Sequence, residues 1–203
     1  MKSLSIGKIR GLQEISSSSG LITVLALDHR GTLIKAMGLN EKDIDVYQQV
    51  RDFKFLTIQY LLPFATAVLI DPQFGGAEAI AHGVIPGSKG LMITLESSGY
   101  LGEPTARYNE IIPGWSPAKI KRMGASAIKF KIDYHPDAGQ ATRRTEELVR
   151  QVSEKAASSD IPLLLEPISY SIDSRIKKES AEFAQQRPSI VEETARRLGP
   201  MVD

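Results

Sequence analysis

Five short apolar segments along this chain each end on an ionisable residue or alternate with ionisable residues. They are Val24–Leu27, Ala67–Ile70, Leu91–Leu95, Ala127–Asp133 and Ile161–Leu165; Asp28, Asp71, Glu96 and Glu166 directly follow the first, second, third and fifth. Between these segments, apolar residues recur at three- and four-residue spacings, which is typical of amphipathic helices. The pattern predicts strands that alternate with helices and deliver charged groups to one end of a parallel sheet.

The segment Ala127–Asp133 gives the clearest signal, because its apolar and charged residues alternate strictly. As a strand, it places apolar side chains on one face and charged side chains on the other: Ile128, Phe130 and Ile132 against Lys129, Lys131 and Asp133. An open sheet covered by helices on both faces would tolerate the charged face poorly. The interior of a barrel accepts it near the carboxyl ends of the strands, where barrel enzymes hold their catalytic groups.

We predict strands at about 21–28, 66–71, 90–96, 126–133 and 161–168. Helices are predicted around Ile9–Ile15 and at about 43–62, 77–82, from 116 onward, 139–157 and 188–198. The segment 97–113 is predicted as a long loop, because no turn such as Asn-Gly signals a hairpin. No Gly-x-Gly-x-x-Gly motif follows the first strand, which disfavours a dinucleotide-binding open sheet.

These elements predict an α/β protein of the (β/α)8 TIM barrel type, in which residues 1–203 form a single domain with about five of the eight βα units. Such a barrel needs roughly 250 residues, so we expect the C-terminal part of the barrel to be missing from this chain. The segment Pro200–Asp203 is predicted to begin a sixth strand. The two outermost strands would keep unpaired backbone groups, so we expect the 203-residue chain to associate through them.

Composition narrows the function classes. The net charge is +1 without a run of like charges, which gives no support for a nucleic-acid or membrane-surface partner. There is no cysteine, hence no thiolate nucleophile, and His82 and His135 are isolated, so we predict no metal or other cofactor. The first residues lack the apolar core of a signal peptide, and no segment approaches about 18 consecutive apolar residues, so we expect a cytoplasmic protein.

Lys129 and Lys131 are the sharpest candidates for chemistry. A lysine in a partly desolvated pocket beside another cation has a lowered pKa and becomes a usable amine nucleophile or acid/base group. The alternative is an exposed strand with solvated lysines. Glu166 sits in an apolar run, which would raise its pKa unless a lysine pairs with it. It fits either a general acid/base or a structural ion pair with Lys129.

Asp28 follows the first strand beside His29 and Arg30. It fits a carboxylate that handles the proton of a substrate hydroxyl, with Arg30 available for an anion; the alternative is an aspartate that accepts loop N–H groups. Arg107, in the predicted long loop, is a candidate for holding a substrate phosphate, against the alternative of a solvated arginine. Asp71 and Glu96 carry less weight, because a charge at a strand end is ordinary loop chemistry.

Four segments together resemble the class I (Schiff-base) aldolases of the tagatose 1,6-bisphosphate aldolase family, which are (β/α)8 barrels. They are Leu25–Gly31, Ala125–Tyr134, Leu163–Tyr170 and Phe183–Pro188, and the similarity extends from about residue 20 to the end of the chain. The resemblance implies metal-independent aldol cleavage, in which a lysine on the sixth strand condenses with a substrate ketone.

Carried over position by position, the resemblance gives each candidate a role. Asp28 matches the aspartate that positions substrate hydroxyls, Lys129 the lysine that assists the imine chemistry, and Glu166 the glutamate used in proton transfer. His29 stands where the family commonly has glutamine. The Schiff-base lysine is expected a few residues beyond Asp203, and the main phosphate-binding loops later still, within roughly 90 further residues.

The sequence leaves three functions open. The first is cleavage of a ketose 1,6-bisphosphate, similar to tagatose 1,6-bisphosphate, to dihydroxyacetone phosphate and glyceraldehyde 3-phosphate. The second is cleavage of a sulfosugar phosphate such as sulfofructose 1-phosphate. The third is a non-catalytic regulator that senses a sugar phosphate. All three imply a phosphorylated ketose as the partner, with His29, Arg30, Lys131 and Arg107 as candidate contacts, and barrels of this family often form homo-oligomers.

Overall fold

The computed structural model describes residues 4–202 and contains a five-stranded parallel sheet. Its strands are β1 (Val24–Leu27), β2 (Ala67–Ile70), β3 (Gly90–Thr94), β6 (Ala127–Tyr134) and β7 (Leu163–Ser169). The strands lie in the order β1-β2-β3-β6-β7, which is also their order along the chain. A doubly wound open sheet reverses its strand order at a switch point, whereas this sheet advances in one direction and curls as part of a TIM barrel.

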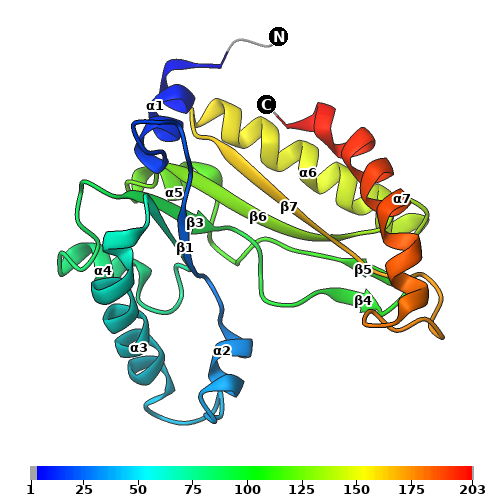
Figure 1. The fold of residues 1–203 in the computed structure, drawn as a ribbon, viewed down its shortest axis with the longest axis horizontal. Coiled ribbons are helices and arrows are strands. Elements are labelled where there is room, and N and C mark those ends of the chain that lie inside the picture. Colours follow the sequence, from blue (N-terminus) through cyan, green and yellow to red (C-terminus); the bar gives the residue numbers. More distant parts are fainter. Residues whose placement is uncertain (1–3, 203) are drawn as a thin grey trace.

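Seven α-helices occur in residues 4–202. They are α1 (Ile6–Ile15), α2 (Gly31–Ala36), α3 (Val46–Leu61), α4 (Gly76–Ala81), α5 (Pro117–Arg122), α6 (Gln140–Ser158) and α7 (Ala181–Leu198). Two short 3-10 turns, η1 (Leu62–Phe64) and η2 (Gly199–Met201), follow α3 and α7. Helix α6 packs against β6 and α7 against β7, while α1 lies at the end of the sheet where the strands begin (Figure 1).

The two faces of the sheet have different contents, because side chains alternate along each strand. The outer face packs against the helices and forms the main apolar core, in which Phe130 and Ile132 of β6 meet Val149 and Val152 of α6. The inner face holds only a small apolar cluster, where Ile15 of α1 covers its amino end. Beyond that cluster, toward the carboxyl ends, the inner face carries charged side chains.

All five predicted strands are present, and the alternation predicted for Ala127–Asp133 is confirmed. Ile128, Phe130 and Ile132 are fully buried in the main core, and Lys129 points the other way. Within the described residues, β1 and β7 each have one strand neighbour and form the edges of the sheet, as expected.

Two local predictions are wrong, and a third is tested only in part. Helix α2 lies in the stretch between the first strand and residue 43, which is predicted as a loop, and it is only six residues long, which is too short for a periodic signal. The predicted loop 97–113 contains an antiparallel hairpin, β4 (Leu101–Glu103) and β5 (Ala106–Tyr108), whose turn lacks the Asn-Gly type of sequence. Of the segment predicted to begin a sixth strand, Pro200 and Met201 belong to the η2 turn, Val202 has an extended backbone, and Asp203 lies outside the described residues.

The last helix also begins earlier than predicted. The prediction starts the helix at about residue 188, with Ser189 near its start. Helix α7 instead begins after Ser180, whose side chain accepts a hydrogen bond from the Phe183 amide as an N-cap. Phe183 and Ile190 are buried on one face of α7, so tertiary packing outweighs the local preference of Pro188.

Candidate active site

The carboxyl end of the sheet holds a cavity of about 720 Å³. Asp28 follows β1, Glu96 lies just beyond β3, and Lys129 and Glu166 belong to β6 and β7. These four residues lie on the inner face of their strands, and the strands end at the same end of the sheet. Their side chains therefore lie close together. All four line the cavity, together with His29, Arg30 and Lys131. Six of the seven predicted site residues are therefore gathered in one cavity.

The ammonium of Lys129 is the centre of this cluster. Its Nζ lies 2.8 Å from Asp28 Oδ2, 3.0 Å from Glu96 Oε1 and 3.0 Å from Glu166 Oε2. Lys129 and Glu96 are almost fully buried, whereas the Glu166 side chain remains 48% exposed. The ion pair between Glu166 and Lys129 that the sequence suggested is thus present, and Glu166 is the carboxylate open to a ligand.

The expectation that Lys129 has a lowered pKa is wrong. Burial lowers the pKa of Lys129, but attraction to Glu96 and the contacts with Asp28 and Glu166 outweigh burial and raise it above the usual value. The neighbouring cation has little influence, because Lys131 Nζ donates to Asp133 Oδ2 at 2.5 Å and to the Gly99 carbonyl at 3.0 Å. Lys129 is therefore a protonated group that can donate a proton or stabilise negative charge.

Glu96 is the residue that the sequence analysis undervalued. Besides Lys129, its carboxylate accepts hydrogen bonds from the Thr94 hydroxyl at 2.6 Å and from the Lys131 amide at 3.0 Å. Its side chain is only 4% exposed, so these contacts fix it rigidly. The signal was available in the spacing, since Met92, Thr94 and Glu96 share one face of an alternating strand.

Arg30 is buried, and its guanidinium bridges two elements. Nη1 donates to Gln73 Oε1 at 2.9 Å, and Nη2 donates to the backbone carbonyl of Glu96 at 2.9 Å. The third donor, Nε, is buried without a hydrogen-bond partner among the described residues. His29 lines the same cavity beside Arg30. Arg30 thus connects two parts of the fold, and its Nε–H group could donate a further hydrogen bond.

Arg107 is the one predicted site residue that does not line this cavity. Its guanidinium lies between the rings of Tyr100 and Tyr170, at 4.3 and 4.9 Å from their centroids. It also donates to the Pro104 carbonyl and lies 3.6 Å from Asp133 Oδ1. These contacts attach the β4–β5 hairpin to the ends of β6 and β7.

Two cations at the cavity were missed by the sequence analysis. Lys35 of α2 and Lys178, in the segment between β7 and α7, both line it and are exposed. Neither could be placed from sequence, because one belongs to a short unpredicted helix and the other to an irregular segment. Together with Arg30 and Lys131 they give the cavity several donors suited to an anion.

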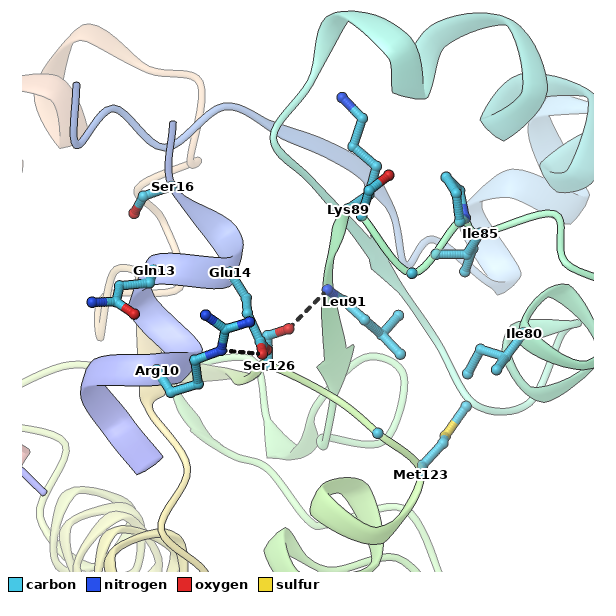
Figure 2. Close-up of a pocket in the computed structure, with 14 residues that line it drawn as sticks. Arg10, Gln13, Glu14, Ser16, Ile80, Ile85, Lys89, Leu91, Met123 and Ser126 are labelled. Atoms are coloured by element: carbon cyan, nitrogen blue, oxygen red, sulfur yellow. Dashed lines mark hydrogen bonds and ion pairs between the residues drawn. The ribbon is translucent and has the colours of Figure 1, made fainter. Parts of the chain in front are cut away.

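A second cavity, of about 470 Å³, lies at the amino end of β3 beside α1 (Figure 2). Two of its charged groups are paired with each other, since Arg10 Nε donates to Glu14 Oε1 at 2.9 Å. The Ser126 hydroxyl accepts a hydrogen bond from the Leu91 amide. Among residues 4–202, no three His, Cys, Asp or Glu side chains are arranged to hold a metal ion. No helix in that range is long and apolar enough to cross a membrane.

Comparison with known proteins identifies similar sequences. The chain is 30% identical over 191 residues to a tagatose 1,6-diphosphate aldolase of Streptococcus agalactiae and 32% identical over 198 residues to tagatose 1,6-diphosphate aldolase 2 of Enterococcus faecalis. These alignments cover 93% and 95% of this chain but 57% of each relative, so the chain spans little more than half of their length.

The fold has solved counterparts as well. The structure of an archaeal fructose 1,6-bisphosphate aldolase superposes with a TM-score of 0.55 at 20% identity, covering 94% of this chain and 66% of that one. The profile of the family described as DeoC/LacD family aldolase matches residues 22–200, which include every charged residue of the Lys129 cluster. The chain therefore belongs to the DeoC/LacD family of aldolases.

Proposed function

We propose that this chain contributes the first part of the active site of a class I aldolase that cleaves a ketose 1,6-bisphosphate, with tagatose 1,6-bisphosphate as the leading substrate. The products are dihydroxyacetone phosphate and glyceraldehyde 3-phosphate. The observation that carries the proposal is the Lys129 ammonium held among Asp28, Glu96 and Glu166 in an open cavity. The names of the curated relatives support the choice of substrate.

The proposed reaction forms and breaks an imine. A lysine amine adds to the C2 ketone, and the resulting carbinolamine loses water to give a protonated imine. The imine accepts the electron pair of the C3–C4 bond while a base removes the proton of the C4 hydroxyl, which releases glyceraldehyde 3-phosphate. Protonation of the enamine at C3 and hydrolysis of the imine then release dihydroxyacetone phosphate and free the lysine.

Three residues of this chain have proposed roles in those steps. Lys129, held protonated, donates to the oxygen that leaves the carbinolamine as water. Glu166 exchanges protons with the substrate, because it is the most exposed of the three carboxylates and lies 3.0 Å from Lys129 Nζ. Asp28, 2.8 Å from the same ammonium, orients the substrate hydroxyls. The imine-forming lysine itself is proposed to lie on the sixth strand of the complete barrel.

The remaining cations support a phosphorylated substrate. The carboxylates that line the cavity are Asp28, Glu96 and Glu166, and all three face Lys129. Lys35 and Lys178 are exposed at the same cavity, and no ion pair within residues 4–202 involves their side chains, so they make its mouth positive. A phosphate attached to the substrate would be attracted there, with Arg30 behind it.

The test is imine trapping with the protein expressed from its native gene. The protein is incubated with dihydroxyacetone phosphate, reduced with borohydride, and mapped by peptide mass spectrometry. The proposal expects one labelled lysine and release of triose phosphates from tagatose 1,6-bisphosphate. Absence of any labelled lysine in a protein that binds the substrate would exclude the Schiff-base mechanism and favour a sensor. Comparing turnover on fructose 1,6-bisphosphate and sulfofructose 1-phosphate tests the substrate.

A further inference from the structure

Lys54 and Asp71 form an ion pair that is completely buried. Lys54 belongs to α3, Asp71 follows β2, and both side chains are 0% exposed. Lys54 Nζ donates to Asp71 Oδ2 and also lies 5.8 Å from the centroid of the Phe74 ring. Burial lowers the pKa of Lys54, and the carboxylate of Asp71 opposes that shift. The reaction outlined above uses neither residue.

Stability alone does not explain this pair. Removing two charges from water is so unfavourable that a well-packed apolar pair of similar volume is often as stable as a buried ion pair, or more stable. We therefore look for a second role of this buried charged pair. One such role is to fix a specific arrangement of the polar groups around it. The contacts of Asp71 identify that arrangement.

The second oxygen of Asp71 shapes the turn after β2. Asp71 Oδ1 accepts hydrogen bonds from the amides of Gln73 at 2.9 Å and Phe74 at 2.8 Å. The turn is tight, because a Cβ atom on Gly76 would lie 2.5 Å from the Asp71 carbonyl oxygen, and Gly75 has a φ of +87°. Lys54 holds the other oxygen, so the carboxylate and the turn are fixed together.

The turn delivers Gln73 to the candidate active site. Gln73 Oε1 accepts a hydrogen bond from Arg30 Nη1, and Arg30 Nη2 donates to the Glu96 carbonyl, each at 2.9 Å. Arg30 Nη2 also lies 3.8 Å from Glu96 Oε1, the same oxygen that is 3.0 Å from Lys129 Nζ. A continuous series of polar contacts thus runs from Lys54 to Lys129.

We propose that Lys54 and Asp71 are positioning residues, which fix the turn that carries Gln73 and thereby hold Arg30 against Glu96 beside Lys129. The effect on catalysis rests on the proposed aldolase function. The effect on Arg30 does not depend on that function, because it is measured without substrate.

The experiment separates positioning from stability. Lys54→Met alone leaves the Asp71 carboxylate buried without its partner and is expected to destabilise the protein. The double variant Lys54→Met with Asp71→Leu removes both charges and is expected to recover most of that loss. Gln73→Leu breaks the next contact and leaves the ion pair intact. Lys89→Met is the matched control, since Lys89 donates to the Ala65 and Pro63 carbonyls outside this series of contacts.

The readout is the rate at which phenylglyoxal modifies Arg30 in the protein expressed from its native gene, followed by peptide mass spectrometry. Arg30 is buried, so its modification requires local opening. The proposal expects modification about tenfold faster in the double variant and in Gln73→Leu, at thermal stability close to that of the control. A wild-type rate in a stable double variant would overturn it, because the pair would then be structural only.

Kinetics provide the second readout. Where tagatose 1,6-bisphosphate is cleaved, kcat of the double variant and of Gln73→Leu is expected to fall roughly 10- to 100-fold. KM is expected to change far less, and Lys89→Met is expected to keep both values. An unchanged kcat in variants with faster Arg30 modification would overturn the catalytic part. A protein without aldolase activity would refute the proposed function, while the Arg30 measurement would still decide the positioning.

Discussion

The amino and carboxyl ends of the sheet differ in where the charged groups beside them find partners. At the amino end, Arg10 pairs with Glu14 one turn away on the same helix, and α1 covers a small apolar cluster around Ile15 and Met92. At the carboxyl end, Lys129 is surrounded by carboxylates from three other parts of the chain. Local pairs stabilise an element, whereas a charge cluster assembled from several strands depends on the complete fold.

That difference separates stability from chemistry within one sheet. The strands are parallel, so one register sets both ends of the sheet. The register that places Ala127 in the amino-end cluster also places Lys129 among the carboxylates. The amino end is expected to govern folding and the carboxyl end catalysis, as in barrel enzymes generally. The predictions below test this division.

The largest expected effect comes from Lys129→Met. It removes the cation that three carboxylates share and leaves the buried Glu96 with only the more distant Arg30 beside it, so kcat for tagatose 1,6-bisphosphate should fall roughly 10²- to 10⁴-fold. The free energy of unfolding should also fall, on the order of 3 kcal/mol. Triose phosphate release and urea unfolding measure the two effects. Lys131→Met removes a second cation of the same cavity from the same strand face, and an equal loss of kcat in that variant would contradict a distinct catalytic role for Lys129.

Ile15→Ala tests the opposite end. Ile15 is 4% exposed in the amino-end cluster, so truncation should lower the free energy of unfolding by about 2–5 kcal/mol. Below its lowered Tm, the variant should keep wild-type kcat and KM, because Ile15 does not line the active-site cavity. Ile6→Ala, at an 80% exposed position of the same helix, should change neither property. A fall in kcat of the folded Ile15→Ala variant would contradict the assignment of stability to the amino end and catalysis to the carboxyl end.

The sequence predicted the sheet well because a buried parallel strand leaves a strong local signal. Alternation alone identified the face that carries Lys129, and the charges at the strand ends identified Asp28 and Glu166. It suggested the pair of Lys129 with Glu166 but not the contacts of Lys129 with Asp28 and Glu96, since pairing depends on strand order and register. Thus Lys131 was assigned beside Lys129 as a cationic neighbour, although it turns to Asp133, and Glu96 was undervalued.

Short and irregular segments were the least predictable. The β4–β5 strands have three residues each, too few for a period to emerge, and their position depends on contacts far away in the sequence. Arg107 was therefore assigned to a loop and to a phosphate, with no sign of the two tyrosine rings that enclose it. Lys54 lies in a well-predicted helix, yet its burial depends on Asp71 seventeen residues later.

Arg107→Met tests whether Arg107 stabilises the β4–β5 hairpin or contacts a substrate phosphate. Loss of the stacked guanidinium should loosen the β4–β5 hairpin and lower the free energy of unfolding by about 1 kcal/mol. Limited chymotrypsin cleavage at Tyr100 should become faster. KM for tagatose 1,6-bisphosphate should change little, because Arg107 does not line the cavity. A KM raised by an order of magnitude with unchanged cleavage at Tyr100 would instead support the phosphate contact that the sequence suggested.

The smallest expected effect is a pH dependence that belongs to the carboxyl end alone. Folding raises the pKa of Lys129 above its ordinary value of 10.5. The charged cluster therefore contributes fully to the free energy of unfolding below that pH, and this contribution is lost as the pH rises further. The difference in free energy of unfolding between wild type and Lys129→Met should therefore stay constant from neutral pH to about 9 and narrow above 10.5. Urea midpoints of both proteins across this range measure it. A difference that narrows on acidification from neutral pH, with no change in alkali, would mean that the carboxylates rather than the ammonium control the cluster.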